Sequence, residues 1–396
     1  MPKISVIGQG YVGLPLALAA CEAGYYVIGI DNNPNKIEQL KSGNSGIEDV
    51  SNEKLSKYIG SGRFKPTSEF DEVSRSSLIL ICVPTPLSDR NLPDLTAIES
   101  AAINISKYLT KGSVVILEST VKPGTTRDFL VPILEQGSGL SREDFNVAFS
   151  PERIDPLSKK WHIKNTPKIV AGLTENSKKL TMDFYSKFID TVIPVESVEV
   201  AETAKLLENS FRLINISFIN EVSIFCQKLG IDINDVINAA ATKPYGFMPF
   251  YPSIGVGGHC IPVDPVYLAN KADEIGVETR FIDLAVQINK EMPGYFVGRA
   301  EEKLGGLKGK KVLVVGVSYK PNIADVRETP VEELIIGLAK RGAEVSWHDD
   351  LVKEWNGKKS VALSNNFDLV ILATPHDYLD LKKLGSVPIL NTRSSI

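Results

Sequence analysis

The sequence contains few of the residues that form disulfide bonds or bind metal ions. Among its 396 residues there are only four cysteines and four histidines. The cysteines are far apart and form no Cys-x-x-Cys pair, which excludes a disulfide framework and a zinc site of the usual spacing. The histidines also lack metal-ligand spacing, so we expect no metal. These residues are Cys21, Cys82, Cys226, Cys260, His162, His259, His348 and His376.

Three further features are missing. No stretch approaches the roughly 20 apolar residues of a membrane span, and the N-terminus lacks the charged and apolar regions of a signal peptide. There is no basic excess, since 44 basic residues face 48 acidic ones, which argues against nucleic-acid binding. With 43% hydrophobic and 23% charged residues, the chain predicts a folded cytosolic protein of two or three domains.

Alternating strand and helix patterns fill the first part of the chain. Lys3 to Gly8 reads as a strand, Leu14 to Ala23 as an apolar helix, and Tyr26 to Asp31 as a second strand. The continuous apolar runs Leu78–Val83 and Ser113–Glu118 suit strands that are buried on both faces of a parallel sheet. This alternation predicts a doubly wound α/β domain over residues 1–196.

The pattern changes in the middle of the chain and then returns. Ser197 to Leu229 predicts one helix of about 30 residues, ended by Gly230, which is long enough to connect domains and to offer a face to a second subunit. A shorter helix is expected over Ile231–Ala241. We therefore expect a central helical domain over 197–307 and a second, rather short Rossmann-like sheet over 308–396. Its elements are Lys310–Val317, Thr329–Arg341, Glu344–His348 and Asp368–Ala373.

The first strand and helix are joined by a dinucleotide-binding pattern. Gly8 permits the tight turn, Gly10 lets the backbone approach a pyrophosphate, and Gly13 lets helix and strand pack closely. Asp31, at the end of the second strand, offers a carboxylate to the ribose 2′-hydroxyl and would repel a 2′-phosphate. The pattern predicts NAD rather than NADP. The alternative is a Rossmann-like domain whose glycine turn binds no dinucleotide.

The stretch Gly255–Pro265, GVGGHCIPVDP, is the most unusual in the chain. Three glycines before Cys260 allow close approach of a ligand and leave the thiol accessible, and Asp264 follows within the same loop. The other three cysteines lie in apolar helices or strands and are expected to be buried. A nucleophilic thiol with NAD implies addition to an aldehyde, loss of hydride to give a thioester, and hydrolysis to an acid. We assign no catalytic role to His259.

Seven blocks along nearly the whole chain make the sequence resemble the UDP-glucose/GDP-mannose dehydrogenase family. They are GQGYVG (8–13), CVPTP (82–86), ESTVKPGTT (118–126), SPERIDP (150–156), ETAKLLENSFR (202–212), GVGGHCIPVDP (255–265) and YKPNIADVRETP (319–330). The resemblance implies oxidation of a sugar 6-CH₂OH to a carboxylate with two NAD reduced. It also implies a UDP-sugar-binding C-terminal domain, a homodimer formed through the central helix, and a place in polysaccharide biosynthesis.

The resemblance assigns roles residue by residue. Cys260 is the implied nucleophile. Lys205 and Asn209, four apart on one helix face, resemble the pair that stabilises oxyanions and orders water. Glu152 and Asp264 resemble the carboxylates that manage protons. A solvated charge is the alternative for Lys205 and Glu152. Thr120 is a further catalytic candidate. The implied NAD contacts are Gly8, Gly10, Tyr11, Val12, Gly13, Asp31, Lys36, Thr85, Thr120 and Arg327. The implied substrate contacts are Ser150, Pro151, Glu152, Arg153, Lys205, Asn209, Phe250, Tyr251, Ser253, Gly257 and Lys320.

Two departures from the family pattern bear on shape and substrate. Leu157 and Ser158 stand where a glycine usually follows the SPER block, which affects the local loop. Pro244, within TKPYGF (242–247), replaces an arginine common in UDP-glucose enzymes. This favours UDP-N-acetylglucosamine as substrate, followed by UDP-N-acetylmannosamine, UDP-N-acetylgalactosamine and UDP-glucose. A non-catalytic NAD-binding protein and a two-electron alcohol dehydrogenase are the competing functions.

Overall fold

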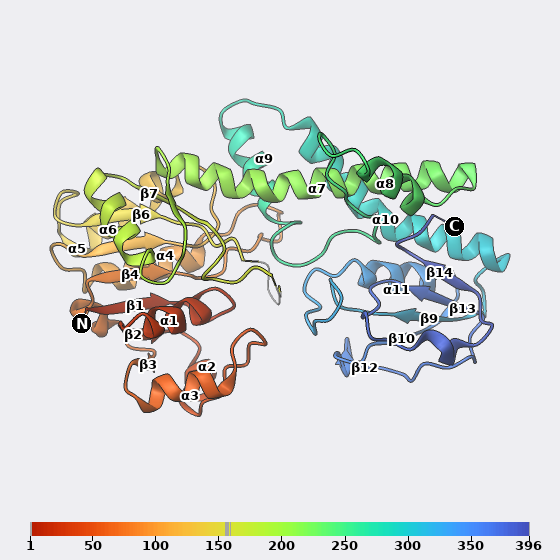
Figure 1. Cartoon of the computed structure of the whole chain (residues 1–396), viewed down its shortest axis with the longest axis horizontal. Coiled ribbons are helices and arrows are strands. Elements are labelled where there is room, and N and C mark those ends of the chain that lie inside the picture. Colours follow the sequence, from red (N-terminus) through yellow and green to blue (C-terminus); the bar gives the residue numbers. More distant parts are fainter. Residues whose placement is uncertain (1, 155–157, 159, 396) are drawn as a thin grey trace. The chain divides into compact units, whose positions relative to one another are not determined.

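The computed structural model describes residues 2–154, 158 and 160–395. The chain divides into two compact units, Met1–Leu207 (unit 1) and Glu208–Ile396 (unit 2). Figure 1 labels most of the helices and strands of each. None of the helices in the described part of the chain is both long and apolar enough to cross a bilayer.

Unit 1 is built on one eight-stranded sheet with the order β3-β2-β1-β4-β5-β6-β7-β8. All neighbouring strands are parallel except β6 and β7, which are antiparallel. The elements are β1 (Lys3–Ile7), α1 (Gly13–Glu22), β2 (Tyr26–Ile30), α2 (Pro34–Lys41), α3 (Asn52–Gly60), β3 (Phe64–Thr67), β4 (Leu78–Ile81), α4 (Thr96–Ser106), β5 (Val114–Leu117), α5 (Val131–Ser138), β6 (Asn146–Phe149), β7 (Lys168–Gly172), α6 (Glu175–Tyr185), β8 (Val192–Pro194) and the start of α7 (Val198–Leu229).

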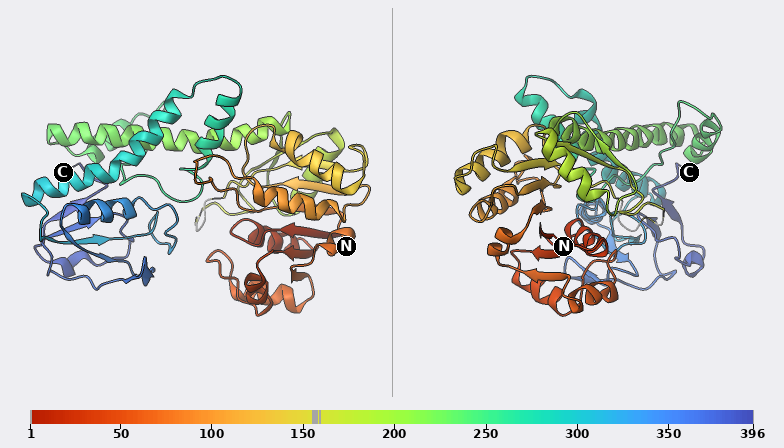
Figure 2. Two further views of the ribbon diagram at one scale, coloured as in Figure 1. Left: turned by 180° about the vertical axis from the view of Figure 1, so that it is seen from behind. Right: turned by 60° about the vertical axis from the view of Figure 1, so that its left-hand side comes forward.

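Both faces of this sheet are covered, as continuous apolar strands require. Residues of α1, α3 and α6 pack with one set of strand side chains, and residues of α4 and α5 pack with the other. Figure 2 shows helices on the two sides of the sheet. The strand order reverses between β1 and β4, and ligands of open α/β sheets bind at the carboxyl ends of strands beside such a reversal.

Unit 2 contains the rest of α7, further helices and a four-stranded parallel sheet of order β10-β9-β13-β14. A hydrophobic core that includes residues of α10 and α11 packs on one face of the sheet, and loop residues with a short 3₁₀ turn, Leu381–Leu384, pack on the other. The elements are α8 (Ile233–Ala241), α9 (Asp264–Glu274), α10 (Arg280–Leu304), β9 (Lys311–Val315), α11 (Val331–Lys340), β10 (Glu344–His348), β11 (Glu354–Trp355), β12 (Lys358–Lys359), β13 (Leu369–Leu372) and β14 (Ile389–Asn391).

The prediction of an α/β fold with two Rossmann-like sheets and a long helix between them in the chain is confirmed. The helix α7 has 32 residues and stops at Gly230, whose φ of 72° is left-handed. Two features differ from a regular doubly wound plan. The antiparallel β6–β7 pair was not anticipated, and no α-helix connects β10 to β13 in this described stretch, which has only the β11–β12 hairpin and loop. The domain boundaries at 196 and 307 stay predictions.

Candidate functional site

The turn after β1 admits only glycine at two of its three glycine positions. Gly8 has φ 89°, and a Cβ there would lie 2.6 Å from the carbonyl oxygen of Cys82. A Cβ on Gly13 would lie 1.8 Å from the carbonyl oxygen of Gly8, so helix α1 packs against the turn itself. Gly10 faces open space, with nothing among the described residues within 4 Å of its would-be Cβ. The turn therefore leaves room for a ligand at its middle glycine.

The carboxylate of Asp31 is fixed beside this turn. Its two oxygens accept hydrogen bonds from the backbone N–H groups of Gln9 and Asn33, each at 2.9 Å. A carboxylate oxygen has capacity for a second hydrogen bond, so Asp31 can still accept one from a ribose hydroxyl. The open glycine turn, the uncapped N-terminus of α1 and this carboxylate fit the pyrophosphate and ribose of NAD.

Lys36 and the strand-end threonines lie near the same edge of the sheet. The ammonium of Lys36 donates to the carbonyl oxygen of Ser45 at 2.9 Å, and burial lowers its pKa. Thr85 follows β4 and Thr120 follows the neighbouring β5, and both are half-buried. The hydroxyl of Ser119 donates to the carbonyl oxygen of Val83 at 2.7 Å, which ties the two strand-end loops together. Tyr11 and Val12, in the glycine turn, are half-buried.

The segment Ser150–Arg153 follows β6 and is pinned to the start of β7. Ser150 donates its hydroxyl to the carbonyl oxygen of Ile169 at 2.8 Å, and the Arg153 guanidinium donates to that of Pro167 at 2.8 Å. The Glu152 carboxylate accepts from the N–H groups of Arg153 and Ile154, at 2.6 and 2.7 Å. Leu157 lies outside the described residues. The hydroxyl of Ser158 accepts a hydrogen bond from the N–H of Trp161.

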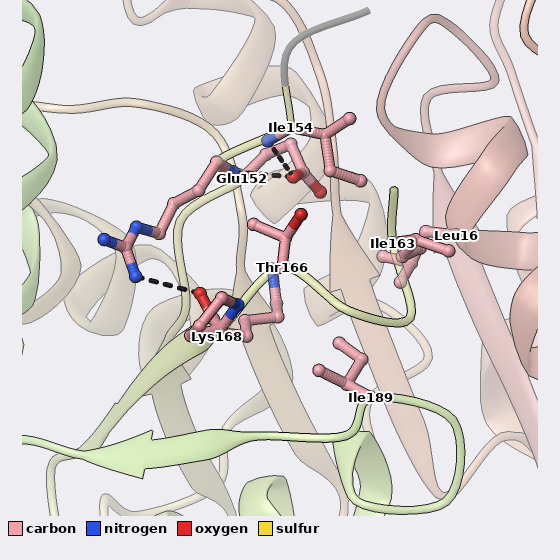
Figure 3. Close-up of a pocket in the computed structure, with 9 residues that line it drawn as sticks. Leu16, Glu152, Ile154, Ile163, Thr166, Lys168 and Ile189 are labelled. Carbon is pink, nitrogen blue, oxygen red and sulfur yellow. Dashed lines mark hydrogen bonds between the residues drawn. The ribbon is translucent and has the colours of Figure 1, made fainter. Parts of the chain in front are cut away.

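Glu152 lines a small pocket, shown in Figure 3. The space that a water molecule can enter is about 10 Å³, room for a single water. The buried hydroxyl of Thr166 in the same pocket has no hydrogen-bond partner within residues 2–154, 158 and 160–395. The lining residues are Leu16, Glu152, Arg153, Ile154, Ile163, Thr166, Pro167, Lys168 and Ile189.

In unit 2, a carboxylate–amide pair stands next to the Cys260 loop. Asp264 is the first residue of α9 and is 3% exposed, and its Oδ2 accepts a hydrogen bond from the Asn209 side chain at 2.5 Å. The backbone N–H of Asp264 donates to the carbonyl oxygen of Cys260 at 2.8 Å. Lys205, which belongs to unit 1 and is half-buried, precedes Asn209 by one turn of α7. The loop thus places Cys260 one helical turn from a buried carboxylate.

The four thiols differ in exposure. Cys260 is half-buried, whereas Cys21, Cys82 and Cys226 are buried. Burial raises the pKa of Cys21 to about 12 and holds the pKa of Cys82 well above its ordinary value. Since the thiolate is the nucleophile, these two thiols are inert near neutral pH. Cys260 is the thiol best suited to react.

The glycines before Cys260 are packed against the segment Tyr319–Pro330. A Cβ on Gly257 would lie 2.5 Å from the carbonyl oxygen of Glu328, and the N–H of Gly258 donates to that of Arg327 at 3.1 Å. The guanidinium of Arg327 pairs with Asp325 at 2.5 Å; burial would raise the pKa of Asp325, but this partner lowers it. Glycine is therefore required at 257 for close backbone approach.

The remaining predicted substrate contacts also lie in unit 2. Phe250 is half-buried, with its ring 5.7 Å from that of Phe211, while Tyr251 is exposed. Ser253 accepts a hydrogen bond from the N–H of Gly255, and its own N–H donates to Asn220. Lys320 is half-buried in the loop after β9, and its carbonyl oxygen accepts from Ser318 at 2.9 Å.

The predicted residues thus form two groups. Unit 1 brings the glycine turn, Asp31, Thr85, Thr120 and the Glu152 segment to the carboxyl ends of β1, β2, β4, β5 and β6. Unit 2 brings Asn209, Cys260 and Asp264 together, with Gly257 packed against the Tyr319–Pro330 segment. Among the residues that the structure describes, no group of three or more His, Cys, Asp or Glu side chains could hold a metal ion.

Sequence reasoning missed Asn289, in α10. Its side chain accepts from the N–H of Val256 at 2.6 Å and donates to the carbonyl oxygen of Val256 at 3.3 Å, and so holds the glycine loop before Cys260. A single asparagine in a helix has no spacing signal. Pro293 lies one turn later and has no N–H to donate to the carbonyl oxygen of Asn289. Because a proline usually interrupts a helix, α10 itself was hard to predict from the sequence. Lys168 was also missed.

Comparison with known proteins defines the class. Family models match three segments of the chain: the NAD binding domain of the UDP-glucose/GDP-mannose dehydrogenase family over residues 2–189, its central domain over 199–291 and its UDP binding domain over 313–393. The chain belongs to the UDP-glucose/GDP-mannose dehydrogenase family. It is an NAD-dependent UDP-sugar dehydrogenase.

Individual relatives narrow this class without fixing the sugar. The chain is 37% identical to Protein CapL of Staphylococcus aureus, with 96% of this chain and 92% of that protein covered. It is 36% identical to a UDP-N-acetyl-D-glucosamine 6-dehydrogenase of Salmonella typhi, covering 98% and 92%. The solved structure of a UDP-N-acetylmannosamine dehydrogenase from Pyrococcus horikoshii superposes with a TM-score of 0.90 at 29% identity, covering 100% and 96%.

Proposed function

We propose that this enzyme oxidises the C6 hydroxymethyl group of a UDP-N-acetylhexosamine to the uronate, with UDP-N-acetylglucosamine as the preferred substrate. The observation that carries the proposal is the Cys260 loop, where a half-buried thiol precedes a buried carboxylate bonded to Asn209. That set suits thioester chemistry at an aldehyde. A two-electron oxidation of an alcohol would need neither the thiol nor the carboxylate–amide pair.

The chemistry divides among this chain's own residues. Bound NAD supplies the hydride acceptor for both oxidations. Removal of a proton and a hydride from the C6 alcohol gives the aldehyde. Cys260 adds its thiolate to this aldehyde, and the oxygen takes a negative charge that Lys205 and Asn209 stabilise. The Asn209 amide has two N–H groups, so one remains after the bond to Asp264. Loss of a hydride leaves a thioester on Cys260.

Hydrolysis then completes the reaction. Water adds to the thioester carbon, the carbon–sulfur bond breaks and the thiolate returns, while Glu152 and Asp264 accept protons. In total, one alcohol and one water become one carboxylate, with two hydrides transferred and three protons released. Thr120, after β5, is assigned to the same chemistry. The NAD contacts are assigned to residues 1–196 and to Arg327, and the UDP contacts to Lys320 and other residues of 308–396.

The N-acetylated sugar is inferred from two observations. Residues 242–247 hold Pro244 in place of the arginine expected of UDP-glucose enzymes, and proline has no N–H to donate to a sugar hydroxyl. A relative named as a UDP-N-acetyl-D-glucosamine 6-dehydrogenase covers almost the whole chain. UDP-N-acetylmannosamine is the second candidate, because a similar solved structure bears that name.

We also propose a homodimer formed through α7. Phe211, Phe218, Phe225 and Leu229 recur at spacings of seven and four along this helix, and they are 45, 62, 62 and 58% exposed. Such a stripe is the pattern of a helix that buries one face against another helix. Phe218→Glu should convert the dimer to a monomer, as measured by light scattering. A wild-type monomer at micromolar concentration would contradict the proposal.

The product is a nucleotide-linked uronic acid, which suits polysaccharide biosynthesis. A cytoplasmic location stays a prediction. Counting NADH per sugar consumed tests the function. Two NADH support the four-electron reaction, one indicates a simple alcohol dehydrogenase, and none with any UDP-sugar indicates a non-catalytic NAD-binding protein.

A further inference from the structure

A buried cluster of Glu118, Lys168 and Tyr185 lies inside unit 1. The ammonium of Lys168, at the start of β7, is 2.6 Å from a carboxylate oxygen of Glu118, which directly follows β5. Tyr185, the last residue of α6, donates its hydroxyl to the other oxygen of Glu118. The Lys168 and Glu118 side chains are 6 and 0% exposed. Burying such a pair costs desolvation energy that often cancels its attraction, so stability alone is a weak reason for it.

The remaining hydrogen bonds of Lys168 point to the Glu152 segment. Its ammonium donates to the carbonyl oxygens of Pro151 and Ser150, at 3.2 and 3.4 Å. An ammonium has three N–H donors. Glu118 accepts a hydrogen bond from one of these N–H groups. The other two donate to the backbone carbonyl oxygens of the two residues just before Glu152.

Strand register places Glu152 opposite Lys168. The antiparallel pairing of β6 and β7 aligns Ala148 with Gly172 and Phe149 with Ala171. Continued for three more residues, this register sets Glu152 across from Lys168. The hydrogen bonds from the Ser150 side chain to the Ile169 carbonyl and from the Arg153 side chain to the Pro167 carbonyl are consistent with this register. Glu152 and Lys168 also line the same pocket (Figure 3).

The cluster joins two loops of the site. Glu118 stands two residues before Thr120, in the loop after β5, whereas Lys168 holds the segment after β6. Burial alone would lower the pKa of Lys168, but the carboxylates of Glu118 and Glu152 outweigh burial and raise it. The ammonium therefore stays charged throughout the pH range in which an enzyme works.

We propose that Lys168 is a positioning residue for Glu152: fixed by Glu118 and Tyr185, its ammonium holds the Ser150 and Pro151 carbonyls and so sets where the Glu152 carboxylate stands. The proposal rests on the role given to Glu152 above. Lys168 touches neither substrate nor cofactor, and it acts through Glu152. Misplacing a catalytic group by about 1 Å costs on the order of 100-fold in rate. The loss belongs to kcat, because Lys168 binds no part of the substrate.

The test uses the full-length enzyme and a double-mutant cycle. Replacing Lys168 alone would leave the Glu118 carboxylate buried and unpaired, so Glu118→Gln and Lys168→Met are combined as one neutral pair variant. We expect kcat to fall about 100-fold, with KM for the UDP-sugar and for NAD changed less than about threefold. In a Glu152→Gln background the same pair variant should cause almost no further loss, because residues that act through one group are not additive.

The outcomes separate this proposal from the proposed function. An unchanged kcat in Glu152→Gln alone overturns the role of Glu152. A kcat loss in Glu152→Gln, with an equal further loss from the pair variant, leaves the function intact and overturns positioning by Lys168. A rise in KM at unchanged kcat also overturns it. If the Lys168→Met pair variant does not fold, Glu118→Gln with Lys168→Gln replaces it, with a smaller loss and the same lack of additivity expected.

A matched control lies on the same sheet. Lys65, in β3, pairs with Glu72 at 2.5 Å, and its side chain is 61% exposed. Lys65→Met removes an ion-paired lysine from unit 1 without touching the Glu152 segment. We expect kcat and KM of this variant to equal those of the wild type. Thermal unfolding and NADH binding, measured on every variant, show which ones are folded.

Discussion

Asp31 is the residue that we expect to set cofactor choice. Its carboxylate is held in place by the N–H groups of Gln9 and Asn33, so it cannot turn away from a ligand at the glycine turn without losing two hydrogen bonds. A negative charge fixed there attracts the 2′-hydroxyl of NAD and repels the 2′-phosphate of NADP. We therefore expect the preference for NAD over NADP to depend on this single charge.

We therefore expect a strong preference for NAD that Asp31→Ala narrows by roughly 10- to 100-fold in the ratio of kcat/KM values, equivalent to about 1.4 to 3 kcal/mol. Initial rates with each cofactor at saturating UDP-sugar measure this. Asp31→Asn, which keeps a side-chain oxygen for one backbone N–H, controls for damage to the turn. Equal turnover of NAD and NADP by the wild type would contradict the role of Asp31.

Cys260 is the second residue whose replacement tests the proposed function. Cys260→Ser should lower acid formation on the order of 1,000-fold or more while NAD binding survives, because a serine ester forms and hydrolyses poorly at this site. Acid release is measured by chromatography, and intact mass detects a trapped sugar adduct. Cys226→Ser, at a buried thiol in α7, is the control and should keep wild-type kcat. Full activity of the Cys260→Ser variant would refute nucleophilic catalysis.

Spacing in the sequence was sufficient to propose those site residues whose placement depends on local geometry. Gly8, Gly13 and Asp31 follow from the strand–turn–helix pattern, and Asp264 from its place in the Cys260 loop. Lys168 and Asn289 could not be found in this way, because each bonds to backbone atoms that only the tertiary pairing brings near. A polar residue that donates a hydrogen bond to a backbone carbonyl produces no recognisable spacing in the sequence.

Among the elements, the bounds of α7 could be predicted from the sequence, whereas those of α10 could not. The helix α7 has no proline, and its first glycine is the one that ends it, so its bounds were predicted almost to the residue. The helix α10 has Pro293 and Gly294 inside it. Both residues predict a break. Packing of Met292, Phe296 and Val297 into the core of unit 2 keeps the helix continuous.

The first turns of α7 are tied to the loop after β5 by Glu202. Its carboxylate accepts from the N–H groups of Gly124 and Thr126 at 2.7 and 2.8 Å. These bonds favour the ionised form, but burial outweighs them and raises the pKa of Glu202 to about 7. Because this value lies above the ordinary one of 4.5, the folded state binds a proton that the unfolded chain releases. The resulting stability is complete below about pH 4.5 and is lost as the pH rises through 7.

The free energy of unfolding of the Glu202→Gln variant should therefore rise relative to that of the wild type as the pH increases. The expected change is up to about 3 kcal/mol between pH 5 and pH 8. Urea titrations at the two pH values measure the difference. Glu199, one turn earlier, is the control, since the Arg127 guanidinium lowers its pKa to about 2. Glu199→Gln should differ from the wild type equally at both pH values. A constant difference for Glu202→Gln would contradict the raised pKa.

At the scale of the whole molecule, the repeated strand–helix alternation at both ends of the chain predicted two sheets. It could not predict that the second crossover of unit 2 would lack a helix, because residues 349–368 carry no period that excludes one. Nor does periodicity select a sugar epimer. Specificity depends on the shape of a pocket, which is a property of the assembled protein.

The choice of sugar is the prediction that belongs to this scale. Residues 241–249 are all exposed, so the stretch 242–247 presents its side chains outward from its own unit. Tyr245 lies under the ammonium of Lys243, 4.9 Å from its ring centre, and is 72% exposed. With Pro244 between them, this stretch exposes an aromatic face and a cation, but no arginine.

We expect a higher kcat/KM for a UDP-N-acetylhexosamine than for UDP-glucose. A pocket built to bond an N-acetyl group leaves polar atoms unpaired when a plain hydroxyl binds, which produces large discrimination, on the order of 10⁴-fold in favourable cases. Initial rates across concentrations of each sugar, at matched NAD, measure the ratio. Pro244→Arg should move it toward UDP-glucose, while Cys260-dependent acid formation persists with both sugars. A wild-type enzyme that prefers UDP-glucose would contradict the specificity and leave the dehydrogenase chemistry untouched.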